Sequence, residues 1–157
     1  MNANELLPGV EAANANRRIL VIDEDHDIRQ LGFDVLAGAG YYVEAVSNGE
    51  VGWKVIQAAA YDLIVTDHKL LGRTGMEMIE KMRAAAMKTP VIVAARHLPT
   101  HEFARKPWLK PIVMLQRPFP NADLLAAVKK ILCPEVRPTV VPSPNVVKRQ
   151  PAMEMAG

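Results

Sequence analysis

Five short apolar runs, separated by segments of helical periodicity, restrict the fold of this 157-residue chain more than any other feature of its sequence. The runs do not alternate apolar and polar residues, which is typical of strands buried on both faces of a parallel sheet. Their sequences are RILVID (18–23), YYVEAV (41–46), DLIVT (62–66), PVIVAA (90–95) and IVMLQ (112–116). The pattern predicts a doubly wound α/β domain in which helices cover both faces of a five-stranded parallel sheet.

Helical spacing of apolar residues marks the segments that follow the first, second, third and fifth runs. Asn121 stands where its side chain can cap the start of the last helix. The segment between the fourth and fifth runs is different, because Pro99, Pro107 and Pro111 interrupt it. We therefore expect the fourth helix to be short or irregular, near residues 100–106.

The two ends of the chain follow neither pattern. Residues 1–16 are rich in Asn and Ala without a sustained period, which predicts a flexible leader. Residues 134–157 contain prolines at positions 134, 138, 142, 144 and 151, which predicts a flexible, proline-rich tail. The folded domain is expected over residues 17–133.

Composition argues against several classes of function. The net charge is only +2 and the Lys and Arg residues are scattered, so we expect no nucleic-acid partner. The single cysteine, Cys133, leaves no internal disulfide to form. The sequence has no apolar stretch of the length that a signal peptide or a membrane span requires, so we expect a cytoplasmic protein with no membrane partner.

Charged residues stand at the ends of three apolar runs, where open parallel sheets place their ligand sites. Asp23 and Glu24 end the first run, Asp67 follows the third, and Arg117 follows the fifth. If the first and third strands are neighbours, the three carboxylates share one pocket and repel one another unless a cation compensates them. Mg²⁺ is the natural ion, because it prefers oxygen ligands and keeps several waters. Asp67 could then attack phosphorus, with Arg117 beside the phosphate oxygens.

Each of these residues also has a plainer interpretation, because acids at strand ends are solvated and often cap the next helix. The combination at the ends of three separate strands is what favours a functional site. His26 and His68 lie beside the acids and suggest a transition-metal site as a less favoured alternative. We expect His68, Lys69 and His97 to line the mouth of the pocket instead.

Four longer motifs resemble those of the response-regulator receiver domains of two-component signalling. They are ILVIDEDHDIR, YDLIVTDHKLLGRTGMEMIEKMR, TPVIVAAR and RPFPNADLLAAVKKIL, and the resemblance covers about residues 17–132. It implies a flavodoxin-like sheet with the strand order 2-1-3-4-5.

The resemblance implies a role for several single positions. Asp67 matches the phosphoacceptor of the family, and Asp23 and Glu24 match the acidic pair that holds Mg²⁺ together with Asp67. The backbone carbonyl of Lys69 is a further metal ligand by the same resemblance, and Arg117 contacts the phosphate. A histidine kinase or a phosphotransfer protein would donate the phosphoryl group.

Three positions depart from the family, and all three belong to the part that responds to phosphorylation. The family's Ser or Thr at the end of the fourth strand is Ala95, its aromatic switch residue is Met114, and its lysine is Arg117. Ala95 has no hydroxyl, and a hydrogen bond to a charged group is worth about 1.5–3 kcal/mol. Met114 has no ring to reorient, and Arg117 is longer and planar. These changes predict a weakened conformational readout.

The leading interpretation is a phosphoryl-accepting receiver that signals to an unknown downstream protein, with a homodimer as an open alternative to a monomer. It would be a signalling domain rather than an enzyme, although it can catalyse its own phosphorylation and dephosphorylation. The alternative is a receiver-like interaction module that works without phosphorylation. A phosphatase-type hydrolase is disfavoured, because Lys69 stands where such an enzyme needs an aspartate.

Overall fold

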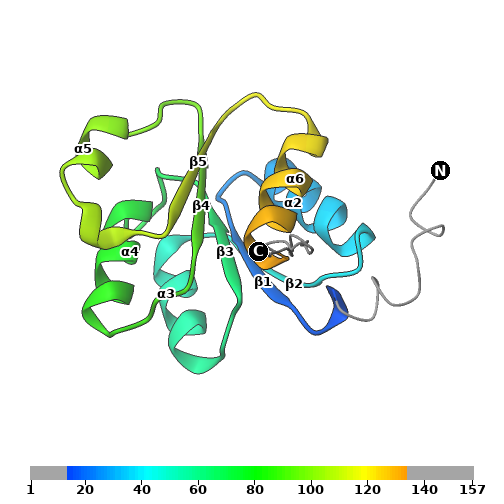
Figure 1. Cartoon of the computed structure of the whole chain (residues 1–157), viewed down its shortest axis with the longest axis horizontal. Helices are drawn as coiled ribbons and strands as arrows, with labels where there is room; N and C mark the ends of the chain where they lie inside the picture. Colours follow the sequence, from blue (N-terminus) through cyan, green and yellow to red (C-terminus); the bar gives the residue numbers. More distant parts are fainter. Residues whose placement is uncertain (1–13, 134–157) are drawn as a thin grey trace, which may run out of the picture.

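A computed structural model describes residues 14–133 and shows a single parallel sheet between two layers of helices (Figure 1). The five strands lie in the order β2-β1-β3-β4-β5, so the predicted flavodoxin-like doubly wound fold is confirmed. The strands are β1 (Arg18–Ile22), β2 (Tyr42–Val46), β3 (Leu63–Thr66), β4 (Val91–Ala95) and β5 (Ile112–Gln116). The helices are α2 (His26–Gly38), α3 (Gly49–Ala58), α4 (Gly75–Ala84), α5 (Thr100–Ala104), the 3-10 helix η2 (Pro107–Leu109) and α6 (Asn121–Leu132).

The central strands are apolar throughout because both faces of the sheet are buried. On one face, side chains such as Leu20 and Ile64 pack against α3, α4 and α5, where Met78 and Met82 of α4 are completely buried. On the other face, side chains from the same strands pack against α2 and α6 (Figure 1). Successive residues of a strand point to opposite faces, so a continuous apolar run is what two covered faces require.

The short fourth helix is also confirmed. The segment forms only the five residues of α5 and the single 3-10 turn η2 before β5 begins. Proline at the start of η2 and at position 111 prevents a longer helix from continuing, since proline lacks the amide hydrogen that the helix needs. The helix anchors itself through Phe103, which is buried against the α4 side of the core.

The predicted cap of the last helix is wrong. Asn121 is the first residue inside α6, Pro120 occupies the capping position, and no side chain caps this end. By contrast, Asn48 caps α3 and Thr74 forms a reciprocal capping box with Glu77 at the start of α4.

The ends of the chain fall largely outside the described residues. This applies to residues 1–13 of the predicted leader and to the whole of the predicted tail, 134–157. Asn14, where the description begins, is buried, and its side-chain amide donates a hydrogen bond to the carbonyl of Ala39 at 2.8 Å. Among the described residues, no helix has the length and apolar character to cross a membrane.

Candidate functional site

Two aspartates lie side by side at the carboxyl ends of the central strands β1 and β3. The parallel register pairs Ile22 with Thr66, so the next residues, Asp23 and Asp67, leave the sheet at the same level. The Asp67 amide still donates to the carbonyl of Ile22 at 3.1 Å, so the two strands stay paired up to the acids. The sheet itself therefore sets the separation of the two carboxylates.

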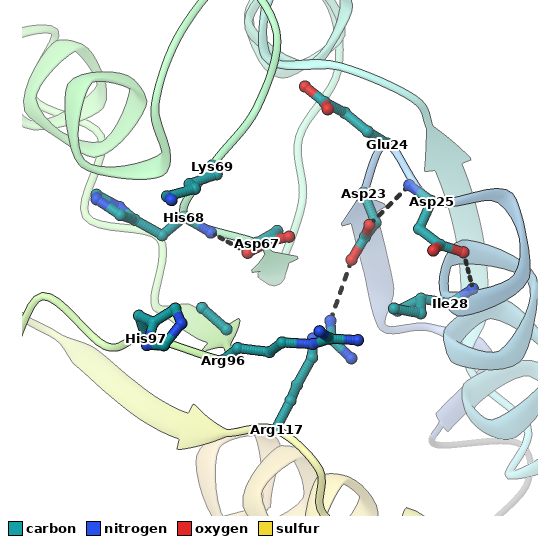
Figure 2. Close-up of a pocket in the computed structure, with 11 residues that line it drawn as sticks. Asp23, Glu24, Asp25, Ile28, Asp67, His68, Lys69, Arg96, His97 and Arg117 are labelled. Atoms are coloured by element: carbon teal, nitrogen blue, oxygen red, sulfur yellow. Dashed lines mark hydrogen bonds and ion pairs between the residues drawn. The ribbon is translucent and has the colours of Figure 1, made fainter.

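A pocket opens at this edge of the sheet and collects residues from four strand ends (Figure 2). It is lined by Asp23, Glu24, Asp25, Ile28, Asp67, His68, Lys69, Ala95, Arg96, His97 and Arg117. The structure thus brings Asp23 and Asp67 together with Arg117, and Glu24 also lines the pocket. It also places His68, Lys69 and His97 at the pocket, as the sequence predicts.

Asp23 is the buried charge of the site, with a relative exposure of 2%. Its carboxylate accepts hydrogen bonds from the Asp25 amide at 2.9 Å and from the Arg117 guanidinium at 3.1 Å. Burial raises the pKa of Asp23, and the neighbouring Asp67 charge raises it further, while the Asp25 amide and Arg117 act in the opposite direction. The net upward direction means that burial, together with the Asp67 charge, outweighs the Asp25 amide and Arg117, so the charged form of Asp23 is disfavoured here.

Arg117 is held by the backbone of the neighbouring strand. Its amide donates to the carbonyl of Ala95 at 2.9 Å, and its Nε donates to the carbonyl of Ala94 at 3.3 Å. The guanidinium also lies over the ring of Phe119, 5.5 Å from its centroid. These contacts aim the guanidinium at Asp23, where it forms the only ion pair between pocket residues in the described part of the chain.

Asp67 is half-buried and is the first residue of a loop that hydrogen bonds hold tightly closed. Its carboxylate accepts the His68 amide at 2.6 Å, and the Gly75 amide donates to the carbonyl of His68 at 2.7 Å. A Cβ atom at Gly75 would lie 2.7 Å from the backbone oxygen of Asp67, closer than real Cβ contacts come. Glycine at position 75 is therefore required for the backbone that presents Asp67.

Oxygen donors dominate the part of the pocket that could hold a cation, but the three predicted carboxylates are not gathered around one point. Across residues 14–133, no three His, Cys, Asp or Glu side chains lie close enough to make a metal site by themselves. Glu24 is exposed and points away from Asp23 and Asp67 (Figure 2). The transition-metal alternative finds no support, because His68 lines the pocket whereas His26 lies beside Arg29, with 3.3 Å between ring and guanidinium nitrogens.

The three divergent positions occupy different places. Ala95 is buried and lines the pocket beside Asp67, where it presents only a methyl group. Arg117 lines the same pocket. Met114 does not: it is half-buried and packs into the core on the face covered by α3, α4 and α5.

Sequence reasoning missed three contributors to the pocket. Asp25 caps α2 by accepting the amides of Asp27 and Ile28, a role signalled by an acid just before a helical period. Arg29 reaches back from α2 to the carbonyl of Asp23 at 2.8 Å and so fixes the acidic loop. Arg96 also lines the pocket; it is the last residue of the motif TPVIVAAR, but the sequence assigns it no role.

A family model described as the response regulator receiver domain matches residues 19–129. Transcriptional regulatory protein DltR of Streptococcus agalactiae is 28% identical over 112 residues, which are 71% of this chain and 50% of that protein. Sporulation initiation phosphotransferase F of Bacillus subtilis is 26% identical over 117 residues, which are 74% of this chain and 94% of that protein. The chain thus spans about half the length of DltR and nearly all of the phosphotransferase.

Solved structures of response regulators are also similar to this chain. Response regulator TrrA of Thermotoga maritima, determined in complex with Mg(2+)-BeF, superposes with a TM-score of 0.65 at 26% identity, over 73% of this chain and 98% of that one. Chemotaxis response regulator CheY4 of Vibrio cholerae superposes with a TM-score of 0.67 at 24% identity, over the same shares, and supports the fold alone.

Proposed function

Because the chain belongs to the response regulator receiver domain family of two-component signalling, we propose that it accepts a phosphoryl group on Asp67. The observation that carries the proposal is the pairing of Asp23 and Asp67 at neighbouring strand ends, with the Arg117 guanidinium 3.1 Å from Asp23. Receiver domains are signalling domains rather than classical enzymes, and they interact with histidine kinases or phosphotransfer proteins. We propose such a protein as the donor.

The donor set suits Mg²⁺, which we propose as the cofactor. Burial and the neighbouring Asp67 charge both disfavour the charged form of Asp23, and a hard cation bound between the two carboxylates would favour it. Asp23, Asp67 and the backbone carbonyl of Lys69 would hold the ion, and Glu24 would join them after its exposed side chain turns toward the pocket. Bound Mg²⁺ supplies charge compensation for the phosphoryl oxygens.

The transfer itself needs little from the protein beyond position and charge. An Asp67 carboxylate oxygen forms the new bond to phosphorus while the bond from phosphorus to the donor breaks, and the donor leaves with that electron pair. No proton has to move from Asp67, because it reacts as a carboxylate. Arg117 is always charged and is anchored at Ala94 and Ala95, so it is placed to contact the phosphoryl oxygens.

We further propose that this phosphorylation produces only a weak conformational response. Ala95 presents a methyl group where a hydroxyl would draw the β4–α5 loop toward the phosphoryl group, and the lost hydrogen bond corresponds to about 1.5–3 kcal/mol. A bias of that size is a large part of what a two-state switch requires. Met114, packed in the core, has no ring to move between two positions.

Downstream partners follow less directly from the site. The phosphotransferase of B. subtilis is matched over nearly its whole length, which supports a role in which the receiver passes its phosphoryl group to another protein. DltR and the regulator NtrC of Rhizobium meliloti are transcriptional regulators of which the chain matches 50% and 25%. The expectation of no nucleic-acid partner therefore stays a prediction about the matched domain, as do the cytoplasmic location and the homodimer.

Intact-mass analysis after treatment with acetyl phosphate and Mg²⁺ tests the acceptor. The wild type and an Asp123→Asn control, altered at an exposed acid of α6, should gain one phosphoryl group, and Asp67→Asn should gain none. Modification of Asp67→Asn to the same extent as the wild type would contradict the assignment of Asp67 as the phosphoacceptor. Backbone NMR spectra of the modified protein test the readout, because large shifts throughout residues 95–115 would contradict a weak response.

The alternative, an interaction module that works without phosphorylation, is favoured by the same Ala95 methyl group and by the ion pair that already occupies Asp23. It predicts no modification by acetyl phosphate and no response to millimolar Mg²⁺. Chemical shifts of Asp23, Asp67 and their neighbours during a Mg²⁺ titration distinguish the phosphoacceptor from the phosphorylation-independent module.

A further inference from the structure

We propose that Arg96 supplies a second guanidinium for the phosphoryl group on Asp67, beside the point where Ala95 offers no hydroxyl. The inference rests on the proposed function and deepens it, because it names a phosphate-binding residue to which neither the motifs nor the acidic pair assigns a role. It is carried by three observations: the backbone of residues 95 and 96 is fixed, the Arg96 side chain faces the pocket, and its charge has no protein partner among the described residues.

The backbone at this point is held from the neighbouring strand. The Arg117 amide donates to the carbonyl of Ala95 at 2.9 Å, and the Gln116 side-chain amide donates to the carbonyl of Arg96 at 3.1 Å. Ala95 is itself buried at the end of β4. The Cα atom of Arg96 is therefore fixed next to the site, although its side chain is exposed.

The side chain of Arg96 extends into the pocket that contains Asp67. Figure 2 shows it running across the pocket toward the guanidinium of Arg117, below the carboxylates of Asp67 and Asp23. Within residues 14–133, no carboxylate forms an ion pair with Arg96 and no hydrogen bond engages its side chain. Arg117, in contrast, is bound to Asp23 and to the carbonyl of Ala94.

Phosphorylation creates the need for such a charge. The carboxylate of Asp67 carries one negative charge, and a phosphoryl group carries roughly −1.5 to −2 at neutral pH together with three strong acceptor oxygens. Arg117 already has a carboxylate partner, so the added charge calls for a donor that is not yet engaged. A guanidinium meets the requirement, because its planar array of donors matches the oxygens of a phosphate.

The role assigned to Arg96 involves no exchange of protons. The bond from phosphorus to acetate breaks as the bond to Asp67 forms when acetyl phosphate is the donor, and acetate leaves with the electron pair. Arg96 keeps its charge throughout and contacts only the non-bridging oxygens. It therefore binds the reacting group directly and lowers the barrier to transfer by stabilising charge on the phosphoryl oxygens.

The test compares Arg96→Gln with Arg105→Gln, a control that removes the same charge from an exposed arginine outside the pocket. With acetyl phosphate and Mg²⁺, the initial rate of modification at low donor concentration should fall about 5–20-fold in Arg96→Gln and stay unchanged in the control. This range begins below the usual value for a hydrogen bond to a charged group, because Arg96 is exposed to solvent. Equal rates for Arg96→Gln and the wild type would overturn the inference.

Introducing a hydroxyl at position 95 gives a measurement that would not change if Arg96 had only a structural role. If Arg96 substitutes for the missing hydroxyl, Ala95→Ser should raise the rate more in the Arg96→Gln background than in the wild type. Equal gains in the two backgrounds would mean that the residues do not act on the same oxygens, which would contradict the inference.

Binding of inorganic phosphate to the unmodified protein, followed by backbone NMR, separates this inference from the proposed function. Phosphate binding that Arg96→Gln weakens and Arg105→Gln does not, without any covalent modification by acetyl phosphate, would support Arg96 and refute the acceptor role of Asp67. Modification of Asp67 that is indifferent to Arg96 would leave the acceptor role standing and overturn the inference. Phosphate binding that is equal in all three proteins would also overturn it.

Discussion

Replacing Arg83 by methionine should destabilise the domain far more than the loss of one half-exposed arginine normally does. Arg83 extends from α4 and donates hydrogen bonds to four backbone carbonyls, those of Met87, Thr89, Leu109 and Pro111. The guanidinium thereby connects the loop before β4 to the end of η2 and to the residue before β5. Methionine keeps most of the apolar stem and removes every donor.

The magnitude follows from which carbonyls lose their partner. Pro111 keeps a hydrogen bond from the Val91 amide at 3.2 Å, so it remains satisfied. The carbonyls of Met87, Thr89 and Leu109 accept no other hydrogen bond among the described residues. At about 1 kcal/mol for each lost bond, the sum is roughly 3 kcal/mol. Burial lowers the pKa of Arg83, so relief of its desolvation offsets part of this loss and brings the expected change to about 2–3 kcal/mol.

Urea unfolding measures this change directly. Lys88→Met is the matched control, because it removes a positive charge from an exposed site in the same loop and should cost less than about 0.5 kcal/mol. Arg83→Lys should recover only a minor part, since an ammonium cannot reach four separate carbonyls. A loss below about 0.5 kcal/mol for Arg83→Met, with an unchanged dependence on urea concentration, would refute the reasoning.

Three further predictions concern charge and loop geometry. Burial raises the pKa of Asp23 above 3.8, so ionisation of its carboxylate destabilises the folded state as the pH rises through the pKa of the folded protein. Asp23→Asn should therefore raise the free energy of unfolding at pH 7, and this gain should shrink toward pH 4. The Tyr61 hydroxyl donates to Glu44 and holds the pKa of that carboxyl below 4.5. Tyr61→Phe should therefore cost about 1 kcal/mol at pH 7, a loss that fades as acid protonates Glu44. Gly75→Ala should slow modification of Asp67 by about tenfold or more in a mass-spectrometric time course, because the new Cβ displaces the Asp67 backbone.

The features predicted correctly from the sequence are those in which one physical constraint dominates. Continuous apolar runs indicate strands covered on both faces, and the structure has them in the predicted order. The prolines at positions 99, 107 and 111 limit the fourth helix for a steric reason that tertiary structure does not override. Acids that end two neighbouring parallel strands must lie close together, so the placement of Asp23 and Asp67 also follows from the sequence.

The features that sequence reasoning missed depend on distances between segments far apart in the chain. Asn121 and Pro120 are equally plausible as the residue before α6, and only the backbone path decides between them. Glu24 lines the pocket, but its exposed side chain points away from Asp23 and Asp67 (Figure 2), which the sequence does not reveal. Arg96 follows a strand like many other basic residues, and its position in the pocket emerges only when β3, β4 and β5 are assembled.

The most direct test of the account is site-resolved mass spectrometry of the protein after reaction with acetyl phosphate and Mg²⁺. We expect a single phosphoryl group per chain, located on Asp67 and dependent on Mg²⁺. A phosphoryl group on the adjacent His68, or on another residue while Asp67 stays unmodified, would contradict it. The same conclusion would follow if no modification occurred under conditions in which a receiver of known activity is fully phosphorylated.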